Sequence, residues 1–411
     1  MICNFRPILP ISVLGRLKTH KSTEAPLHDQ LIPEELLQRS RRLLFITHLA
    51  IGDFAYLQNY FLAFSRKYPH LKVDLWIDEV RRTWLFWRWA HLKKYALYDW
   101  VEQCPCFNRI YRRTYSLPAW WVSRSQARNE DYPIIVTLAT LRPHKYARLA
   151  RSISPSGFIV GMVKKSQPWK VIKRRAFSRL DGHLSEEKTL LPSIKHVTDM
   201  HAHWFQRLCG LSLPPDLRTP FITVPAAWTD WAKKRFPRRQ DEPGPCRRLF
   251  INPYAKDKKR CWPLPAVHRF LSDLKKKDAW KDTQFIVNTP PETAQKTAAF
   301  FRDHPVDGIV IFTADENFFQ LPAVLSLCDM TVSVETSVMH LASSLKIPLV
   351  ALMRQKNPEW APWNRARCVI VTCRTRKDWI EDINAEEVAA ATDAFCEQLQ
   401  QQYPAGQPAP V

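Results

Sequence analysis

Residues 43–53 read Leu-Leu-Phe-Ile-Thr-His-Leu-Ala-Ile-Gly-Asp, an apolar run that ends in a Gly-Asp pair. We predict a buried strand that leads through a tight turn at Gly52-Asp53 into a helix over residues 54–67. Residues 330–334 form a second apolar run, which Glu-Thr-Ser and an Ala/Leu-rich stretch follow. A strand that leads through a polar turn to a helix N terminus is where α/β proteins bind anionic ligands. Two such turns, one in each half of the chain, predict two α/β lobes with a ligand between them.

The rest of the chain alternates short apolar runs with amphipathic stretches. This alternation implies parallel sheets with helices on both faces. A chain of 411 residues is too long for one ordinary core, and it fits two domains of about 150–200 residues each. Further strands are expected at 73–77, 134–138, 158–160, 248–252, 284–288, 308–312 and 349–353.

Proline and charge clusters divide the chain into five parts. These are an N-terminal extension (1–41), a first lobe (42–235), a linker (236–247), a second lobe (248–380) and a C-terminal helix with a tail (381–411). Within the first lobe we expect residues 82–130 to be helical. Residues 164–193 carry charge runs and little apolar order, and we expect them to form a long loop.

The positive charge is concentrated in one region. The formal net charge is +22, and residues 81–180 hold 21 Lys and Arg against 4 Asp and Glu, together with 17 aromatic residues. A basic surface rich in Trp and Tyr is typical of proteins that bind anionic membranes, where the rings lie at headgroup depth. Single-stranded nucleic acid would use the same side chains, and a solvated surface without a partner is the third interpretation. We favour the membrane.

The composition argues against several other classes of protein. No apolar run reaches the roughly eighteen residues that a membrane span needs. The apolar stretch at 8–14 is broken by Pro10 and lacks a small-residue cleavage site, which argues against a signal peptide. The ten cysteines match no zinc spacing. We therefore expect reduced thiols in the cytoplasm and no metal site.

Two strand exits carry candidate chemistry. Asp53 either caps the helix that follows it or acts as a general base in a cleft. After the strand at 248–252, four cations fall within five residues. Such a loop suits a diphosphate, although a solvated charge run would look the same. The four cations are Lys256, Lys258, Lys259 and Arg260.

A third strand exit follows residues 330–334. The hydroxyl groups of Thr336 and Ser337, with the helix N terminus behind them, can hold phosphate oxygens. Glu335 cannot help a phosphate directly and is better suited to ribose or sugar hydroxyls. His340 lies one turn inside the helix, where it is either a ligand-binding residue or a structural histidine.

Together these segments resemble glycosyltransferase family 9, the ADP-heptose:lipopolysaccharide heptosyltransferases, over roughly residues 42–400. The shared motifs are a Gly-Asp turn at 50–53, Tyr68-Pro69 before the second strand, Arg260 two residues before Trp262-Pro263, and an Asp-Ser/Thr-Gly-x-x-His signature at 335–340. The chain departs from the family at several positions. The usual Asp and Gly of the signature are Glu335 and Ser337, the basic residue six before Asp53 is Thr47, and residues 288–291 replace glycines of the second lobe.

The resemblance implies a GT-B fold, in which two Rossmann-like lobes enclose a cleft. The first lobe would bind the acceptor and the second the nucleotide sugar, and the C-terminal helix would cross back to the first lobe. The implied reaction is inverting transfer of a heptosyl group from ADP-heptose, or another nucleotide sugar, to the inner core sugar of a lipid A-linked acceptor. Asp53 would be its general base.

The resemblance also implies roles for other residues. Arg260, with Lys258 or Lys259, would stabilise the leaving diphosphate together with Thr336 and Ser337, and this implies no metal cofactor. Glu335 and His340 would complete the donor site. The anionic glycolipid acceptor would be bound by His48, Arg112, Arg113 and Arg142.

The implied location is cytoplasmic, peripheral on the inner face of the bacterial inner membrane. Two alternatives stay open. One is a family 9 transferase that uses another nucleotide sugar or a protein acceptor. The other is a nonenzymatic binder of nucleic acid or an anionic polymer on a degenerate transferase fold. We expect no nucleic-acid partner, because a pure binder has no use for a carboxylate such as Asp53 at the mouth of a cationic cleft.

Overall fold

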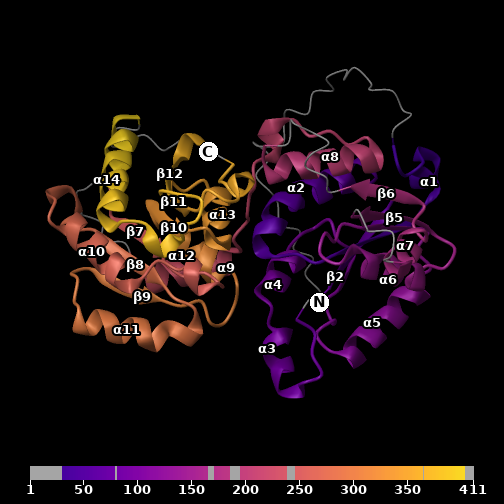
Figure 1. The fold of residues 1–411 in the computed structure, drawn as a ribbon, viewed down its shortest axis with the longest axis horizontal. Helices are drawn as coiled ribbons and strands as arrows, with labels where there is room; N and C mark the ends of the chain where they lie inside the picture. Colours follow the sequence, from indigo (N-terminus) through magenta and orange to yellow (C-terminus); the bar gives the residue numbers. More distant parts are fainter. Residues whose placement is uncertain are drawn as a thin grey trace, which may run out of the picture.

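Two α/β lobes lie side by side in the computed structural model of the protein (Figure 1). The structure describes residues 30–78, 81–164, 171–185, 195–237, 246–363 and 365–402. The predicted tail lies outside these residues, and so does most of the predicted N-terminal extension and of the predicted linker. Each lobe is built on one six-stranded sheet whose strands are all parallel. The prediction of two parallel-sheet lobes is confirmed.

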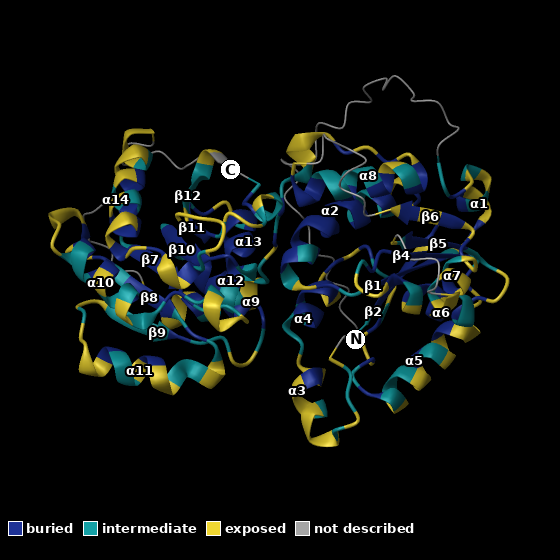
Figure 2. Ribbon diagram, viewed as in Figure 1, coloured by how far each residue is buried: buried dark blue, intermediate teal, exposed yellow. Residues whose placement is uncertain are grey.

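The first sheet has the strand order β3-β2-β1-β4-β5-β6. Its inner strands read as nearly continuous apolar runs because helices cover both faces, and they are buried except at some end residues (Figure 2). The strands are β1 (Arg42–Thr47), β2 (Lys72–Ile77), β3 (Arg109–Tyr111), β4 (Ile134–Thr137), β5 (Phe158–Val163) and β6 (Gly182–Ser185). The helices are α1 (Glu34–Arg39), α2 (Ile51–Lys67), α3 (Trp89–Lys93), α4 (Ala96–Glu102), α5 (Leu117–Asn129), α6 (Pro143–Ile153), α7 (Val171–Phe177) and α8 (Val197–Cys209).

The second sheet has the strand order β12-β11-β10-β7-β8-β9. The sequence predicts four of its strands to the residue, namely β7, β8, β10 and β11. The strands are β7 (Arg248–Asn252), β8 (Gln284–Asn288), β9 (Ile309–Phe312), β10 (Met330–Val334), β11 (Leu349–Met353) and β12 (Cys368–Thr372). The helices are α9 (Ala226–Arg235), α10 (Leu264–Lys275), α11 (Ala294–Asp303), α12 (Gln320–Leu325), α13 (Ser337–Ser344) and α14 (Ala385–Gln402).

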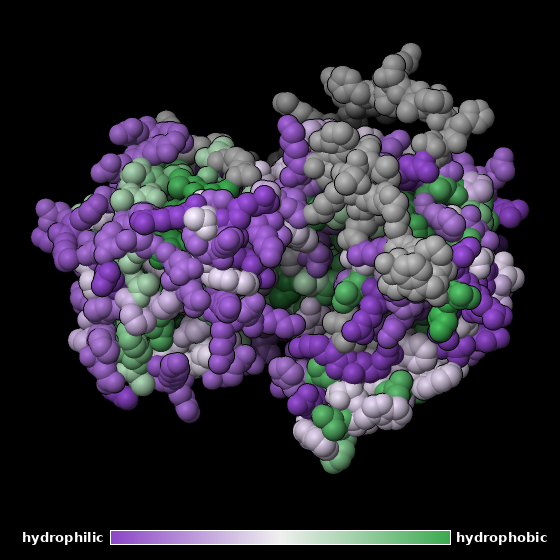
Figure 3. Space-filling view, viewed as in Figure 1, coloured by the Kyte–Doolittle hydropathy of each residue, from purple (hydrophilic) through white to green (hydrophobic). Residues whose placement is uncertain are grey.

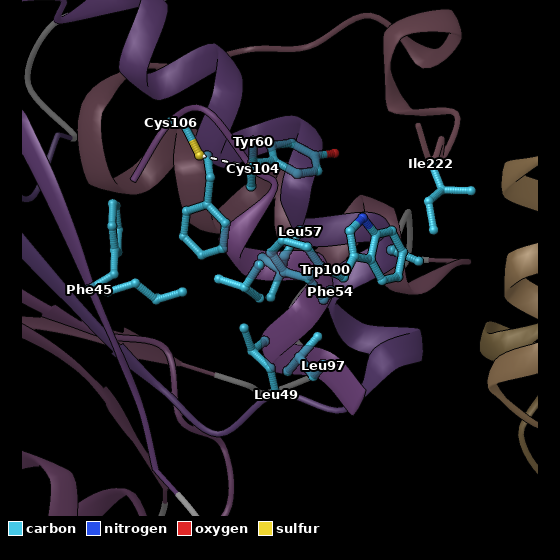
Figure 4. Packing of buried hydrophobic residues seen from close by; sticks show 14 of the residues in the cluster. Phe45, Leu49, Phe54, Leu57, Tyr60, Leu97, Trp100, Cys104, Cys106 and Ile222 are labelled. Carbon is cyan, nitrogen blue, oxygen red and sulfur yellow. Dashed lines mark hydrogen bonds between the residues drawn. The ribbon is translucent and has the colours of Figure 1, made fainter. Parts of the chain in front are cut away.

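An aromatic core attaches α2 to the first sheet and continues toward the second lobe (Figure 4). The ring of Phe45 on β1 lies 5.0 Å from the ring of Phe61 between centroids. Farther along α2, Phe54 meets Trp100 of α4 at 5.1 Å. Trp100 in turn stacks on Phe318 of the second lobe at 5.5 Å. Apolar packing therefore joins the two lobes, so the geometry between them is defined.

Each sheet has a position where the strand order reverses. Strand β1 lies between β2 and β4, and strand β7 lies between β8 and β10. At such a position, the connections that follow two adjacent strands run to opposite faces of the sheet. They leave a crevice between them at the carboxyl edge of the sheet, where ligands bind. In the first lobe this crevice is bounded by residues 48–53 and 138–142, and in the second by residues 253–263 and 335–337.

The structure corrects three expectations about secondary structure. Helix α2 begins at Ile51, so Gly52 and Asp53 belong to its first turn rather than to a turn before it. Residues 82–130, expected to be helical, include strand β3. The loop expected at 164–193 contains α7 and β6. Both unexpected strands have only three or four residues and lie at sheet edges, where no long apolar run is needed.

The C-terminal helix does not cross to the first lobe as the resemblance implied. Helix α14 packs on α10 of the second lobe, where the indole N–H of Trp280 donates to Asp393 at 2.6 Å. Helix α9 also lies with the second lobe, because it packs on α12 and the Phe236 ring that follows it lies 6.0 Å from Phe312. The polypeptide therefore reaches the second lobe before residue 226.

Candidate active site

Asp53 lies at the carboxyl edge of β1, in the first turn of α2. Its Oδ2 accepts a hydrogen bond from the Ala50 N–H at 3.0 Å, so the carboxylate caps the helix. Burial raises the pKa of Asp53 to about 6, against the opposing effect of the backbone hydrogen bonds. A carboxylate has about four lone-pair sites, so the capping bond leaves capacity to accept a proton. A pKa near neutrality suits a general base.

A cavity of about 410 Å³ opens beside Asp53, which is the size of a small ligand site. One wall comes from the first crevice, with residues 47–49 after β1 and Leu138 and Thr140 after β4. Another wall comes from α8 and the residues just before it, and Pro358–Trp360 of the second lobe close the cavity. The carboxylate therefore faces a space that both lobes build.

His48 lines the same cavity. Its ring stacks on the ring of Tyr146 at 6.0 Å between centroids. Burial, with the nearby charge of Lys164, lowers the pKa of His48 to about 4. His201, another lining residue, has its pKa lowered to about 3 by burial and by His196. Both rings are neutral near pH 7, so they present hydrogen-bonding nitrogens rather than positive charge to a ligand.

His340 lies at the contact between the lobes. It is buried in α13, and its Nδ1 is 3.0 Å from the hydroxyl oxygen of Tyr56 on α2. Burial, His196 and Arg260 lower its pKa to about 3. It is absent from the lining of the donor-side cavity described next, so the expected donor-site histidine instead forms part of the interface that holds Asp53 near the second lobe.

A larger cavity, of about 620 Å³, lies at the carboxyl edge of the second sheet. Residues that follow β7, β8, β9 and β10 all line it. This is the edge of an α/β sheet at which ligands bind. The predicted Thr336 and Ser337 are among them, at the N terminus of α13. The Thr336 hydroxyl caps that helix and accepts a hydrogen bond from the Asn252 side chain at 3.0 Å. Asn252 thus ties the end of β7 to the end of β10.

The four predicted cations lie in different surroundings, and Lys256 is the one that lines the donor-side cavity. Arg260 donates from Nη2 to Glu335 Oε1 at 3.1 Å, and also to the main-chain oxygen of Glu335. The ammonium of Lys259 lies 5.3 Å from the centre of the Trp379 ring. Lys258 is exposed. Arg260 therefore reaches the residue next to Thr336, and Glu335, expected to bind sugar hydroxyls, is buried and ion-paired with it.

Arg354, which follows β11, is a residue of this site that the sequence did not predict. Its Nε lies 3.5 Å from Glu335 Oε2, so one carboxylate holds two guanidinium groups. The signal that could have identified Arg354 is its place at the carboxyl end of a parallel strand. Because β11 pairs with β10, this end lies beside Glu335.

The structure places the four expected acceptor-binding residues in different parts of the molecule. Only His48 shares the cavity of Asp53. Arg142 lines a separate groove of about 590 Å³, which has six cations and one carboxylate in its walls. Arg112 lies on the donor-side cavity, paired with Glu102. Arg113 is exposed and lines none of these three spaces.

The basic groove is ordered by contacts between cations and rings. Arg82 lies over Trp120 and Arg124 over Trp121, at 5.1 and 5.2 Å from the ring centres. Arg142 adopts a left-handed backbone conformation with φ 58°, a conformation that residues other than glycine rarely hold without a compensating role. The six cations are Arg82, Arg124, Arg142, Lys145, Arg148 and Arg179.

Among the residues that the structure describes, no group of three or more His, Cys, Asp and Glu side chains is arranged to hold a metal ion. In the same part of the chain, no helix has the length and apolar character needed to cross a membrane.

Known proteins resemble this chain in sequence over residues 182–384 and in structure over most of its length. Residues 182–384 match the family model described as glycosyltransferase family 9 (heptosyltransferase). The family 9 glycosyltransferase from Veillonella parvula DSM 2008 has a similar structure, with 14% identity, 88% of this chain and 98% of that chain covered, and a TM-score of 0.65. The sequence has no match among curated proteins.

Two structures from E. coli are also similar. ADP-heptose lps heptosyltransferase II is 14% identical, with 87% of this chain and 99% of that chain covered, and a TM-score of 0.62. Heptosyltransferase WaaC with ADP is 12% identical, with 86% and 99% covered, and a TM-score of 0.57. At these identities the likeness concerns the fold.

The two lobes and the cleft between them are those of a GT-B glycosyltransferase, which confirms the predicted fold class. The family model matches residues 182–384, which run from β6 of the first lobe to the residue before α14 of the second, and the similar structures cover both lobes. The chain therefore resembles glycosyltransferase family 9 through residues 182–384, and it is an enzyme that transfers a glycosyl group.

Proposed function

We propose that this protein transfers a heptosyl group from ADP-heptose to the inner core sugar of a lipid A-linked acceptor in lipopolysaccharide synthesis. The observation that carries the proposal is the cavity beside Asp53, which residues of both lobes line. A raised pKa equips Asp53 to take a proton at the place where acceptor and donor would meet. The likeness to E. coli ADP-heptose lps heptosyltransferase II and to heptosyltransferase WaaC with ADP supports heptose as the sugar and ADP as the nucleotide.

The proposed reaction is a single displacement that inverts the anomeric carbon. Asp53 removes the proton of the acceptor hydroxyl while the oxygen attacks that carbon. The bond between the anomeric carbon and the diphosphate oxygen breaks, and its electron pair leaves with ADP. Arg260, oriented by Glu335, stabilises the charge that develops on the diphosphate, with Lys258 or Lys259 and the hydroxyls of Thr336 and Ser337. The nucleotide would lie in the larger cavity of the second lobe.

The acceptor would enter from the first lobe. Thr140 lines the cavity of Asp53, while Leu141 and Arg142 line the basic groove, so one short segment connects the two spaces. An anionic glycolipid could therefore place a sugar hydroxyl near Asp53 and His48 and its negative groups near Arg142. Arg113, on the outer surface, would meet the membrane rather than the sugar.

The first lobe also carries exposed apolar side chains suited to a membrane surface. Figure 3 shows hydrophobic atoms at the lower end of this lobe, where Figure 1 places α3. Among the described residues, eight of the nine exposed large apolar side chains lie in this lobe between residues 84 and 172. These eight are Trp84, Phe86, Trp87, Trp121, Val122, Leu141, Val171 and Ile172. We propose a peripheral, cytoplasmic location on the inner membrane, where Trp rings reach headgroup depth and Lys and Arg meet anionic lipid.

The test of the reaction is transfer from ADP-heptose to a lipid A-linked acceptor by the wild type and by Asp53→Asn. The asparagine keeps the side-chain size and can still cap α2, so the melting temperature should change little. It cannot accept the proton, and loss of a general base typically lowers the rate by 10²–10⁴. ADP-heptose affinity, measured by calorimetry, should stay the same. Comparable turnover in both proteins would leave Asp53 as a helix cap and make His48 the next candidate.

A second experiment separates the alternatives. A panel of nucleotide sugars in a thermal-shift experiment identifies the donor, because a ligand at a hundred times its Kd stabilises the folded state by about 2.7 kcal/mol. A larger shift with another nucleotide sugar would replace ADP-heptose but keep the transferase. No shift with any of them, together with tight binding to single-stranded nucleic acid, would favour the nonenzymatic binder.

A further inference from the structure

A second arginine stands beside Arg260 at the edge of the donor site. Arg354 follows β11, and β11 pairs with β10 so that Leu352 lies opposite Val334. This pairing brings the start of the Arg354 side chain next to Glu335. Glu335 Oε1 is 3.1 Å from Arg260 Nη2, and Glu335 Oε2 is 3.5 Å from Arg354 Nε. The main-chain N–H of Arg354 also points at Oε2, at 3.5 Å.

The cluster carries more positive than negative charge. Trp379 holds two of its cations, with Arg354 Cζ 4.8 Å and Lys259 Nζ 5.3 Å from the ring centre. The third cation of the cluster is Arg260. In the described part of the chain, the ion pairs of these three cations involve one carboxylate, that of Glu335. The Glu335 side chain is 6% exposed and that of Arg354 11%. The pair that Glu335 forms with Arg354 is therefore screened weakly by water. The second guanidinium, of Arg260, is 31% exposed, and Lys259 is exposed, so their positive charge can meet an anion that enters from solvent.

The hydrogen-bonding capacity of the two arginines points to the same ligand. A guanidinium group has five N–H donors in a fixed fork. Glu335 is the only hydrogen-bonding or ion-pairing partner of either side chain among the described residues. The remaining N–H groups can make forked contacts to phosphate oxygens. Thr336, the next residue after Glu335, lines the donor-side cavity, so the carboxylate that holds both arginines is one residue along the chain from the wall of that cavity.

We propose that Arg354 binds the diphosphate of the donor together with Arg260, and that Glu335 positions both guanidinium groups. This inference rests on the proposed function, because it assumes that the donor carries a diphosphate. As the bond between sugar and diphosphate breaks, negative charge grows on the leaving oxygen, and the contacts to both guanidinium groups strengthen. Arg354 therefore contributes to donor binding and to departure of the leaving group.

The test measures binding of inorganic pyrophosphate, ADP and adenosine to the full chain by calorimetry at one ionic strength. Arg354→Ala should weaken pyrophosphate and ADP by about tenfold or more, the usual effect of losing a charge-assisted contact. Adenosine, which has no phosphate, should bind with unchanged affinity. Arg354→Lys keeps the charge without the fork and should lose less, by a few fold. Arg374→Ala, an exposed arginine paired with Glu387 on the same lobe, is the matched control and should change nothing.

The outcomes separate this inference from the proposed function. If pyrophosphate does not bind the wild type, or if Arg354→Ala and Arg354→Lys both leave its affinity within twofold, the role of Arg354 is overturned. If Arg354→Ala does not fold in a thermal melt, Arg354→Lys alone decides by the same twofold limit. If pyrophosphate affinity depends on Arg354 but ADP binds no better than pyrophosphate, the diphosphate site stands and the assignment of ADP as the donor nucleotide fails.

Discussion

Gly52 of the first lobe lies directly against the imidazole ring of His340 in the second. A Cβ atom built on Gly52 would stand 2.9 Å from His340 Cδ2, closer than real side chains approach. The same ring also contacts Tyr56 of the first lobe, whose hydroxyl oxygen lies 3.0 Å from His340 Nδ1. Gly52 is helical and is not among the residues with positive φ. The contact between the lobes, rather than the backbone conformation, therefore requires glycine in the Gly-Asp pair.

Gly52→Ala should slow transfer while leaving the second lobe able to bind its nucleotide. Alanine favours a helix over glycine by about 1 kcal/mol, but an added methyl in a filled contact typically costs about 1–3 kcal/mol. The overlap would move α13 relative to α2 and so displace Asp53 from the donor. A displacement of about 1 Å can cost a factor on the order of 100 in rate. We expect turnover to fall at least tenfold and nucleotide affinity, by calorimetry, to stay within threefold.

A double-mutant cycle with His340→Ala supplies the control for Gly52→Ala. If the loss comes from the overlap, then removing the ring makes room for the new methyl group. Gly52→Ala should then cost little in the His340→Ala background, and the two changes should be strongly non-additive. Additive losses in turnover would show that Gly52 matters for a reason other than its contact with His340.

The rate of transfer should depend on pH through Asp53. Burial raises the pKa of this carboxyl from 3.8 to about 6. A general base works only when deprotonated, so kcat/KM should be constant above pH 7 and fall tenfold per pH unit well below 6. The alternative base, His48, has its pKa lowered to about 4, and it would give an inflection two units lower. A pH profile of kcat/KM on the free enzyme distinguishes the two, and an inflection near 4 would move the role to His48.

Much of this site was predictable because strands with apolar sequences end at defined residues. The runs that form β1, β7 and β10 are buried on both faces, and each ends in polar residues. In a parallel sheet those ends meet at one edge, so the sequence predicts that Asp53, Arg260 and Thr336 lie near the carboxyl edges of their sheets. This prediction requires no knowledge of which distant residues are in contact.

The other features of the site depend on contacts between residues that are distant in the sequence. Arg354 and Glu335 meet only because β11 pairs with β10, and the sequence does not say which strands are neighbours. The cations of residues 81–180 looked like one surface, yet Arg112 faces the donor-side cavity and Arg142 a separate groove. Charge alone does not determine the direction of a side chain. His340 has the spacing of the family signature, but its ring packs against Tyr56 across the interface.

Transfer should survive removal of divalent metal ions. Arg260, Arg354 and Lys259 lie around Glu335 and Trp379 next to the proposed diphosphate position. These cations can offset the charge of the leaving group, the role that a metal ion has in other transferases. We expect activity in excess EDTA to stay within twofold of the untreated enzyme. Loss of turnover in the chelator that a divalent ion restores would contradict this account of the leaving group.

Membrane binding should require both the exposed indoles and the positive charge of the first lobe. Trp84 and Trp87 are 74% and 63% exposed. Cosedimentation with vesicles that contain phosphatidylglycerol should fall several-fold when both become serine. It should also decrease as salt is raised, because the lipid charge is screened over about 8–10 Å. Leu217→Ser is the matched control, since Leu217 is 38% exposed and lies outside the basic region, and it should bind as the wild type does.

Equal binding to neutral phosphatidylcholine vesicles, or an unchanged level in the double tryptophan variant, would refute this surface as the membrane contact. Tighter binding to single-stranded RNA than to anionic vesicles would favour a nucleic-acid partner instead.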